Sequence, residues 1–170
     1  MGILQFAVKA YFEFEKLTLM LFLASDHRGY NLKEFLKGYL SQEKILFKDV
    51  GNHKFDPEDD YPDYAFKLAN EVAKNTEENT GVMACGSGLG MVVVANKVKG
   101  VRAGLVISEW FAEHGKENDD LNVISFSADK TDFSSAERIL KKWMSAKFND
   151  SDKYRRRMEK IKKIEEENFK

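Results

Sequence analysis

One stretch of the chain combines the single cysteine with three alternating glycines. It reads Cys85-Gly-Ser-Gly-Leu-Gly90, and it follows an apolar run and precedes a segment of helical periodicity. Glycine lets the backbone turn sharply and approach a ligand closely. Amides at a helix start favour a negative group, and they are expected to lower the pKa of the Cys85 thiol. The loop therefore predicts a base or nucleophile beside an anion site; the alternative is a buried cysteine above a tight turn.

A second polar stretch, Ser25-Asp-His-Arg-Gly-Tyr30, follows the first apolar run of the chain. Asp26 and His27 would present a carboxylate and an imidazole at a strand end, where both could transfer protons. The alternative is that Asp26 only caps the next helix. The functional interpretation gains weight if this loop and the Cys85 loop emerge at the same edge of a sheet.

The elements that must position these groups alternate between strand and helix. We expect strands at 21–25, 45–50, 81–84, 103–107 and 123–126, and helices at 31–40, 63–74, 91–98, 110–116, 134–145 and 152–168. This alternation predicts βαβ units in a Rossmann-like three-layer α/β sandwich, with helices on both faces of a five-stranded parallel sheet. Such sheets bind ligands beyond the carboxyl ends of their strands, so the loops after strands one, three and four are candidates.

The composition excludes several classes of partner and site. A net charge of −1 over 170 residues gives no reason to expect nucleic acid or an anionic membrane. The single cysteine excludes an internal disulfide and favours a reducing compartment, so we expect a cytoplasmic protein. The three histidines and the cysteine match no zinc spacing, and we expect no metal.

Residues 1–19 precede the alternating pattern, and we interpret them as an N-terminal extension of a single domain at 20–170. They could form an added helix, or an extension upstream of a functional start at Met20, which we favour. Charged residues interrupt their apolar positions, so no membrane span is predicted. At the other end, basic residues cluster between 153 and 163, which suits a small anion or, alternatively, a solvated amphipathic helix.

An ordered set of motifs resembles one known family. The set is Ala24-Ser-Asp-His-Arg-Gly-Tyr30, Asp60-Tyr-Pro-Asp-Tyr64, Cys85-Gly-Ser-Gly-Leu-Gly90, Ala95-Asn-Lys97, Gly100-Val-Arg102 and Asn122-Val123. Together they resemble ribose-5-phosphate isomerase B and the related galactose-6-phosphate isomerase subunits, from about residue 20 to 164. The resemblance implies aldose–ketose isomerisation of a sugar phosphate through a cis-enediolate, without a cofactor, in a homodimer or homotetramer whose pockets combine two chains.

The resemblance also implies a role for particular residues. Cys85 would move a proton between C1 and C2 of the open-chain sugar, while Asp26 and Ser87 would contact the sugar oxygens. The amides of the Cys85 loop would stabilise the enediolate, as preorganised donors do. The remaining implied substrate or phosphate contacts are His27, Tyr61, Gly86, Gly88, Leu89, Gly90, Asn118, Lys153 and Arg157.

Three positions depart from the family pattern. Asn118-Asp119 stands where the family commonly has His-Asn, whose histidine opens the sugar ring. The change could mean slow ring opening, use of open-chain sugar, or a substitute for the histidine. His114, one helical turn earlier, is a candidate substitute; the alternative, which we favour, is that it is an ordinary surface histidine. Asp129 and Lys153 stand where arginine is usual. An acid at 129 would weaken phosphate binding unless Lys130 turned in, and lysine at 153 replaces a bidentate fork by a point charge.

These observations lead to one expectation and two alternatives. We expect an enzyme that interconverts ribose 5-phosphate and ribulose 5-phosphate. A six-carbon phosphate, of galactose or allose, is the alternative within the same reaction class. A non-catalytic subunit that binds sugar phosphates is the alternative from another class, and the altered positions 118 and 129 support it.

Overall fold

A computed structural model describes residues 20–169, which form one α/β unit. The proposed extension, 1–19, lies outside the described residues. The strands are β1 (Leu21–Ser25), β2 (Phe47–Gly51), β3 (Thr80–Cys85), β4 (Ala103–Leu105) and β5 (Val123–Ser127). The helices are α2 (Tyr30–Gln42), α3 (Tyr61–Ala73), α4 (Leu89–Ala95), α5 (Glu109–Asp119), α6 (Phe133–Ser145) and α7 (Asp152–Asn168). The predicted fold class is confirmed, with most boundaries shifted by a few residues.

The strands form one parallel sheet in the order β2-β1-β3-β5-β4. The chain reverses its direction of travel across the sheet between β1 and β3, and such a switch point is where open α/β sheets bind ligands. The loops that follow β1 and β3 meet there. The sequence analysis chose the loop after β4 as a third candidate. Because β5 inserts between β3 and β4, the loop after β5 is instead the direct neighbour of the Cys85 loop.

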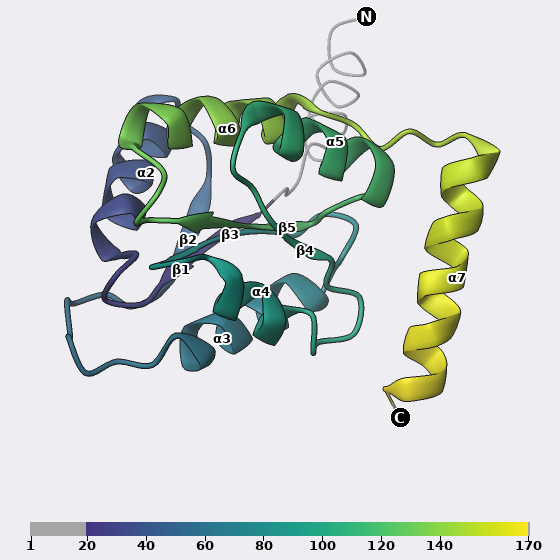
Figure 1. The fold of residues 1–170 in the computed structure, drawn as a ribbon, viewed down its shortest axis with the longest axis horizontal. Helices are drawn as coiled ribbons and strands as arrows, with labels where there is room; N and C mark the ends of the chain where they lie inside the picture. Colours follow the sequence, from purple (N-terminus) through teal and green to yellow (C-terminus); the bar gives the residue numbers. More distant parts are fainter. Residues whose placement is uncertain (1–19, 170) are drawn as a thin grey trace, which may run out of the picture.

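Helices cover both faces of the sheet, with α2, α5 and α6 on one face and α3 and α4 on the other (Figure 1). Alternate residues of β1 enter the two cores: Leu23 packs under α2 and α6, and Phe22 packs against α3. All five residues of β1 and of β5 are buried. Burial on both faces explains why these strands read as continuous apolar runs rather than as alternating ones.

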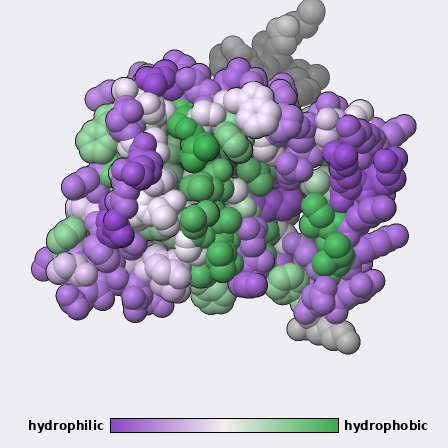
Figure 2. All heavy atoms as spheres, in the orientation of Figure 1, coloured by the Kyte–Doolittle hydropathy of each residue, from purple (hydrophilic) through white to green (hydrophobic). Residues whose placement is uncertain are grey.

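An exposed apolar band lies on one face of the molecule. It consists of Leu89 and Val93 on α4, with Ile107, Trp110 and Phe111 at the start of α5, and each is 45 to 60% exposed. Figure 2 shows apolar spheres gathered over α4 and the segment that leads into α5. We call this set the apolar band.

Helix α7 stands to one side of the sandwich (Figure 1) and contains no buried residue. Its Glu165 carboxylate accepts a hydrogen bond of 2.9 Å from the amide of Gly100, in the loop that leads into β4. The helix is therefore attached near the amino-terminal end of its own sheet. Among the described residues, no helix has both the length and the apolar character to cross a membrane.

Candidate active site

The loop after β1 is fastened to the end of β3. The buried carboxylate of Asp26 accepts a hydrogen bond of 2.9 Å from the amide of Gly29, which is the N-cap residue of α2. Because no side chain among the described residues caps α2, the alternative that Asp26 only caps this helix is wrong. The amide of Asp26 donates to the carbonyl of Ala84 at 3.4 Å. Burial raises the pKa of Asp26, although the Gly29 amide opposes the shift. The Asp26 loop is therefore held against the end of β3.

The backbone of the Cys85 loop encloses the Cys85 sulfur atom. Gly88 adopts φ +77°, in the left-handed region, and its amide donates a hydrogen bond of 3.1 Å to Sγ of Cys85. A side chain at position 88 would be strained, which explains the glycine. Two hydroxyls of β5 hold the loop from beneath: Ser127 donates to the Gly86 carbonyl and Ser125 to the Gly88 carbonyl, both at 2.8 Å.

The expected lowering of the Cys85 pKa is wrong. Burial raises the pKa of the thiol, and the negative charge of Asp26 raises it further. The amide of Gly88 acts in the direction the sequence predicted, but it does not outweigh burial. The sequence showed a helix start, whereas only the fold shows how completely the sulfur is enclosed.

His27 is held by a carboxylate that the sequence analysis did not identify. Oδ1 of Asp59 lies 2.8 Å from Nδ1 of His27 and accepts a second bond of 2.8 Å from the His27 amide. The Asp59 hydrogen bond raises the pKa of His27. Because Nδ1 is bound to Asp59, Nε2 is left to face a ligand. A protonated imidazole in this place suits a phosphate.

A buried lysine supports this pair from behind. The Asn52 amide donates to Oδ2 of Asp59 at 2.6 Å, and the Asn52 carbonyl accepts from Nζ of Lys33 at 2.7 Å. Lys33 is 1% exposed and also pairs with Asp49 at 2.6 Å. The one sequence sign was a lysine between the apolar positions 32 and 36, where a free charge would be costly.

Three further predicted residues lie on or against the Cys85 loop. A methyl group built on Gly90 would lie 2.7 Å from the ring of Tyr61, so this ring lines the loop. Ser87 is exposed, and its hydroxyl accepts a hydrogen bond of 3.3 Å from the Leu89 amide. Leu89 itself is 56% exposed and belongs to the apolar band.

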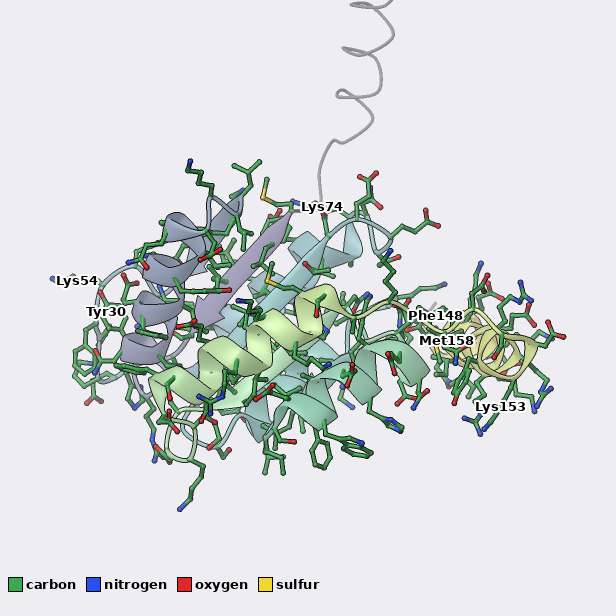
Figure 3. All side chains as sticks on the ribbon, turned by 90° about the horizontal axis from the view of Figure 1, so that it is seen from above. Tyr30, Lys54, Lys74, Phe148, Lys153 and Met158 are labelled. Carbon is green, nitrogen blue, oxygen red and sulfur yellow. The ribbon has the colours of Figure 1, made fainter. Side chains whose placement is uncertain are left out.

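The other predicted contacts lie away from the Cys85 loop of the same chain. Asn118 occupies the far end of α5, where its amide nitrogen lies 2.6 Å from Nε2 of His114. Lys153 and Arg157 lie on α7, and both flank the ring of Tyr154. Figure 3 shows Lys153 at the opposite end of the molecule from Tyr30, which begins α2 beside the Asp26 loop.

Three cavities of the described chain lie elsewhere. Cavities of about 650 and 740 Å³ both include Thr76, Glu77 and Arg102 in their walls, near the amino-terminal ends of β3 and β4. A third, of about 510 Å³, follows β2. None of the predicted site residues lines them. No group of three or more acidic, histidine or cysteine side chains within 20–169 is arranged to hold a metal ion.

The family model for ribose/galactose isomerases matches residues 21–161. The chain belongs to the ribose/galactose isomerase family. The match spans β1 to α7, so it includes the Asp26 loop, the Cys85 loop and the basic positions of α7. The resemblance drawn from the motifs is thereby confirmed.

Relatives within this family share its length and fold. A protein of Mycoplasma genitalium named as a probable ribose-5-phosphate isomerase B is 37% identical, over 89% of this chain and 99% of its own. The Listeria innocua ribose-5-P isomerase B is 34% identical, over 75% of this chain and 84% of its own.

Two solved structures show the same fold. The M. genitalium ribose-5-phosphate isomerase B with bound ribulose-5-phosphate superposes with a TM-score of 0.84 at 38% identity, covering 88% of this chain and 97% of that one. The Trypanosoma cruzi type B ribose 5-phosphate isomerase superposes with a TM-score of 0.83 at 31% identity, covering 89% and 99%.

Proposed function

We propose that this isomerase interconverts ribose 5-phosphate and ribulose 5-phosphate, with Cys85 as the proton-transfer base. The observation that carries the proposal is the position of Cys85: its sulfur lies inside a loop of backbone amides, beside the Asp26 carboxylate, at the switch point of the sheet. This arrangement offers a base and an anion site to the same ligand atoms. The family and the relatives named above support the substrate.

The proposed reaction moves one proton between two carbons. The Cys85 thiolate takes the proton from C2 of the open-chain aldose, and the electron pair forms the enediolate while the C1 carbonyl becomes an alkoxide. Cys85 then returns the proton to C1, and Asp26 and Ser87 assist the matching transfer between the two oxygens. Amides of residues 86–90 stabilise the negative oxygen, and one such donor contributes on the order of a hundredfold in rate.

The raised pKa of Cys85 fits a base rather than a resting nucleophile. A thiol that ionises reluctantly forms a thiolate with a strong affinity for a proton. At neutral pH most sites hold the thiol, so the rate is expected to rise with pH.

A second copy of the chain is proposed to complete each pocket. The apolar band is a face of the kind that dimers bury, and closed two-fold pairing is the commonest solution. On α5, Trp110 stacks on His114 at 4.4 Å between ring centroids, and His114 contacts Asn118. These three residues share a helix face that begins in the apolar band. We therefore propose that His114 and Asn118 approach the partner's sugar, and that Lys153 and Arg157 of α7 approach a partner's phosphate.

The proposal includes a single domain at 20–170 that acts without a cofactor, as a homodimer or homotetramer. It also includes a cytoplasmic location, which rests on the single cysteine. The alternatives are an isomerase for galactose or allose 6-phosphate and a non-catalytic sugar-phosphate-binding subunit. A phosphate contact from His27, held by Asp59, is consistent with the proposal and with both alternatives, because each ligand bears a phosphate.

The deciding experiment is a coupled assay of purified protein with ribose, galactose and allose phosphates in parallel. Turnover of ribose 5-phosphate with the highest kcat/KM is the expected result. A preference for a six-carbon phosphate would establish the first alternative. Binding of sugar phosphates without turnover of any would establish the second.

A further inference from the structure

Arg28 places its guanidinium against the loop that contains the proposed base. A methyl group built on Gly86 would lie 2.6 Å from Cζ of Arg28 and equally close to its Nε. Gly86 directly follows Cys85, and its missing side chain is what allows this approach. A permanently charged group thus lies beside the first amides of the anion-binding loop.

Asp129 holds the guanidinium in this place. Its carboxylate pairs with Nη2 of Arg28 although the two residues are 101 positions apart. Asp129 is itself attached to the same loop, because its amide donates a hydrogen bond of 3.1 Å to the carbonyl of Gly86. Asp129 therefore fixes the charged end of the Arg28 side chain. The backbone of Arg28 is fixed by its place in the loop, directly after Asp26 and His27.

The ion pair leaves most of the guanidinium available. Arginine has five N–H donors, and the described contacts of Arg28 use one nitrogen for Asp129. The side chain is 56% exposed, so the remaining donors are open to a ligand at the loop. Two buried or half-buried acids, Asp26 and Asp59, also lie in this region. Because His27 is already paired with Asp59, a second cation would favour the binding of a dianion there.

We propose that Arg28 binds the phosphate of the sugar phosphate, and that Asp129 is a positioning residue that holds the guanidinium over Gly86. The inference rests on the proposed function for the identity of the ligand, but the anion contact itself does not require turnover. It also explains how an acid is tolerated at position 129: its charge is matched by Arg28 rather than by Lys130.

The test measures binding, in a Cys85→Ser background so that no ligand is consumed. Ribose 5-phosphate and inorganic phosphate are titrated by calorimetry, and unphosphorylated ribose is the neutral comparison. Arg28→Gln is expected to weaken both phosphate ligands by about tenfold to a hundredfold, and to leave ribose unchanged. Asp129→Asn, which retains an acceptor for the guanidinium, is expected to remain within about threefold of the parent.

A double variant separates direct contact from charge balance. If Arg28 only neutralised Asp129, Arg28→Gln with Asp129→Asn would restore the parent affinity for phosphate. We expect the double variant to remain at least about fivefold weaker, because the phosphate has lost its own partner. Full restoration, or an unchanged affinity in Arg28→Gln alone, would overturn the proposal.

Arg138→Gln is the matched control. Arg138 is also 56% exposed and pairs with one carboxylate, Glu109 at 3.3 Å, on the outer helices. It should bind phosphate ligands like the parent, and an equal loss in this variant would show a long-range charge effect and overturn the contact. If the parent protein lacks isomerase turnover while Arg28→Gln still loses phosphate binding, the proposed function fails and the Arg28 contact stands.

Discussion

Asp26 directly follows β1, Cys85 ends the neighbouring strand β3, and the charge of the Asp26 carboxylate opposes ionisation of the Cys85 thiol. Both side chains are at least 95% buried, and burial is the main cause of the raised pKa of each. The amides of Gly29 and Gly88 partly stabilise the two anions. Burial and the neighbouring negative charge therefore both favour the protonated thiol of Cys85.

Replacing Cys85 by serine is expected to abolish isomerisation while leaving the affinity for substrate within severalfold. A serine hydroxyl can still accept the bond from Gly88, but it does not ionise at any working pH, so positioned proton transfer worth about 10²–10⁴-fold is lost. The measurement is kcat in the coupled assay, with the dissociation constant from calorimetry. Retention of more than about a tenth of the rate would exclude Cys85 as the base.

Alkylation of Cys85 by iodoacetamide is expected to be slow at neutral pH and to accelerate with pH. Its midpoint, the pH at which the alkylation rate reaches half its maximum, should lie above that of a free cysteine peptide measured in parallel. The reason is that burial and Asp26 raise the pKa of the thiol. Asp26→Asn removes one negative charge and should move the midpoint down. Labelling is read by mass spectrometry and is unambiguous, since the sequence holds one cysteine. A midpoint below that of the peptide would contradict the raised pKa.

Replacing Asp59 by asparagine is expected to lower the pKa of His27 towards its ordinary value. In the parent the pKa is raised, so the His27–Asp59 pair stabilises the fold below pH 6.5 and loses this contribution as pH rises through the raised pKa. Phosphate affinity of the variant should therefore fall at a lower pH than that of the parent. Imidazole NMR reports the titration directly.

Gly29→Ala is expected to destabilise the protein by at least about 1–3 kcal/mol, because an added methyl group would overlap the carbonyl oxygen of Ala84. The clash pushes the Asp26 loop away from β3, so kcat should fall as well. Gly38→Ala is the matched control: nothing lies within 4 Å of the added methyl, and alanine in a helix should stabilise by about 1 kcal/mol. Urea unfolding measures both. Equal stability of the two variants would show that the β1 loop is not tightly packed on β3.

Mixing two inactive variants is expected to restore part of the activity. One chain carries Cys85→Ser, and the other carries Lys153→Ala with Arg157→Ala. If α7 acts across the subunit boundary, a mixed dimer contains one complete pocket after subunit exchange. Absence of any recovery would place both groups in one pocket of one chain. A monomer in light scattering at micromolar concentration would also contradict the proposed assembly.

The sequence by itself determined the α/β class, because apolar runs of strand length alternate with helical periodicity and each is a local property. It also located the Cys85 loop, since alternating glycines before a helix have a local conformational meaning. It missed the partners of these groups. Asp59 lies in a loop that composition describes only as polar. Lys33 stands between apolar positions, but its partners Asp49 and Asn52 became apparent only in the structure.

Only the tertiary structure decided the order of the strands and the charge state of the site. The insertion of β5 beside β3 brings Ser125 and Ser127 under the Cys85 loop, and it brings Asp129 to Arg28. The direction of the Cys85 pKa depends on how much water the fold removes and on the distance to Asp26. Desolvation and Coulomb interactions depend on three-dimensional distance, which residues far apart in the chain acquire only when the sheet is assembled.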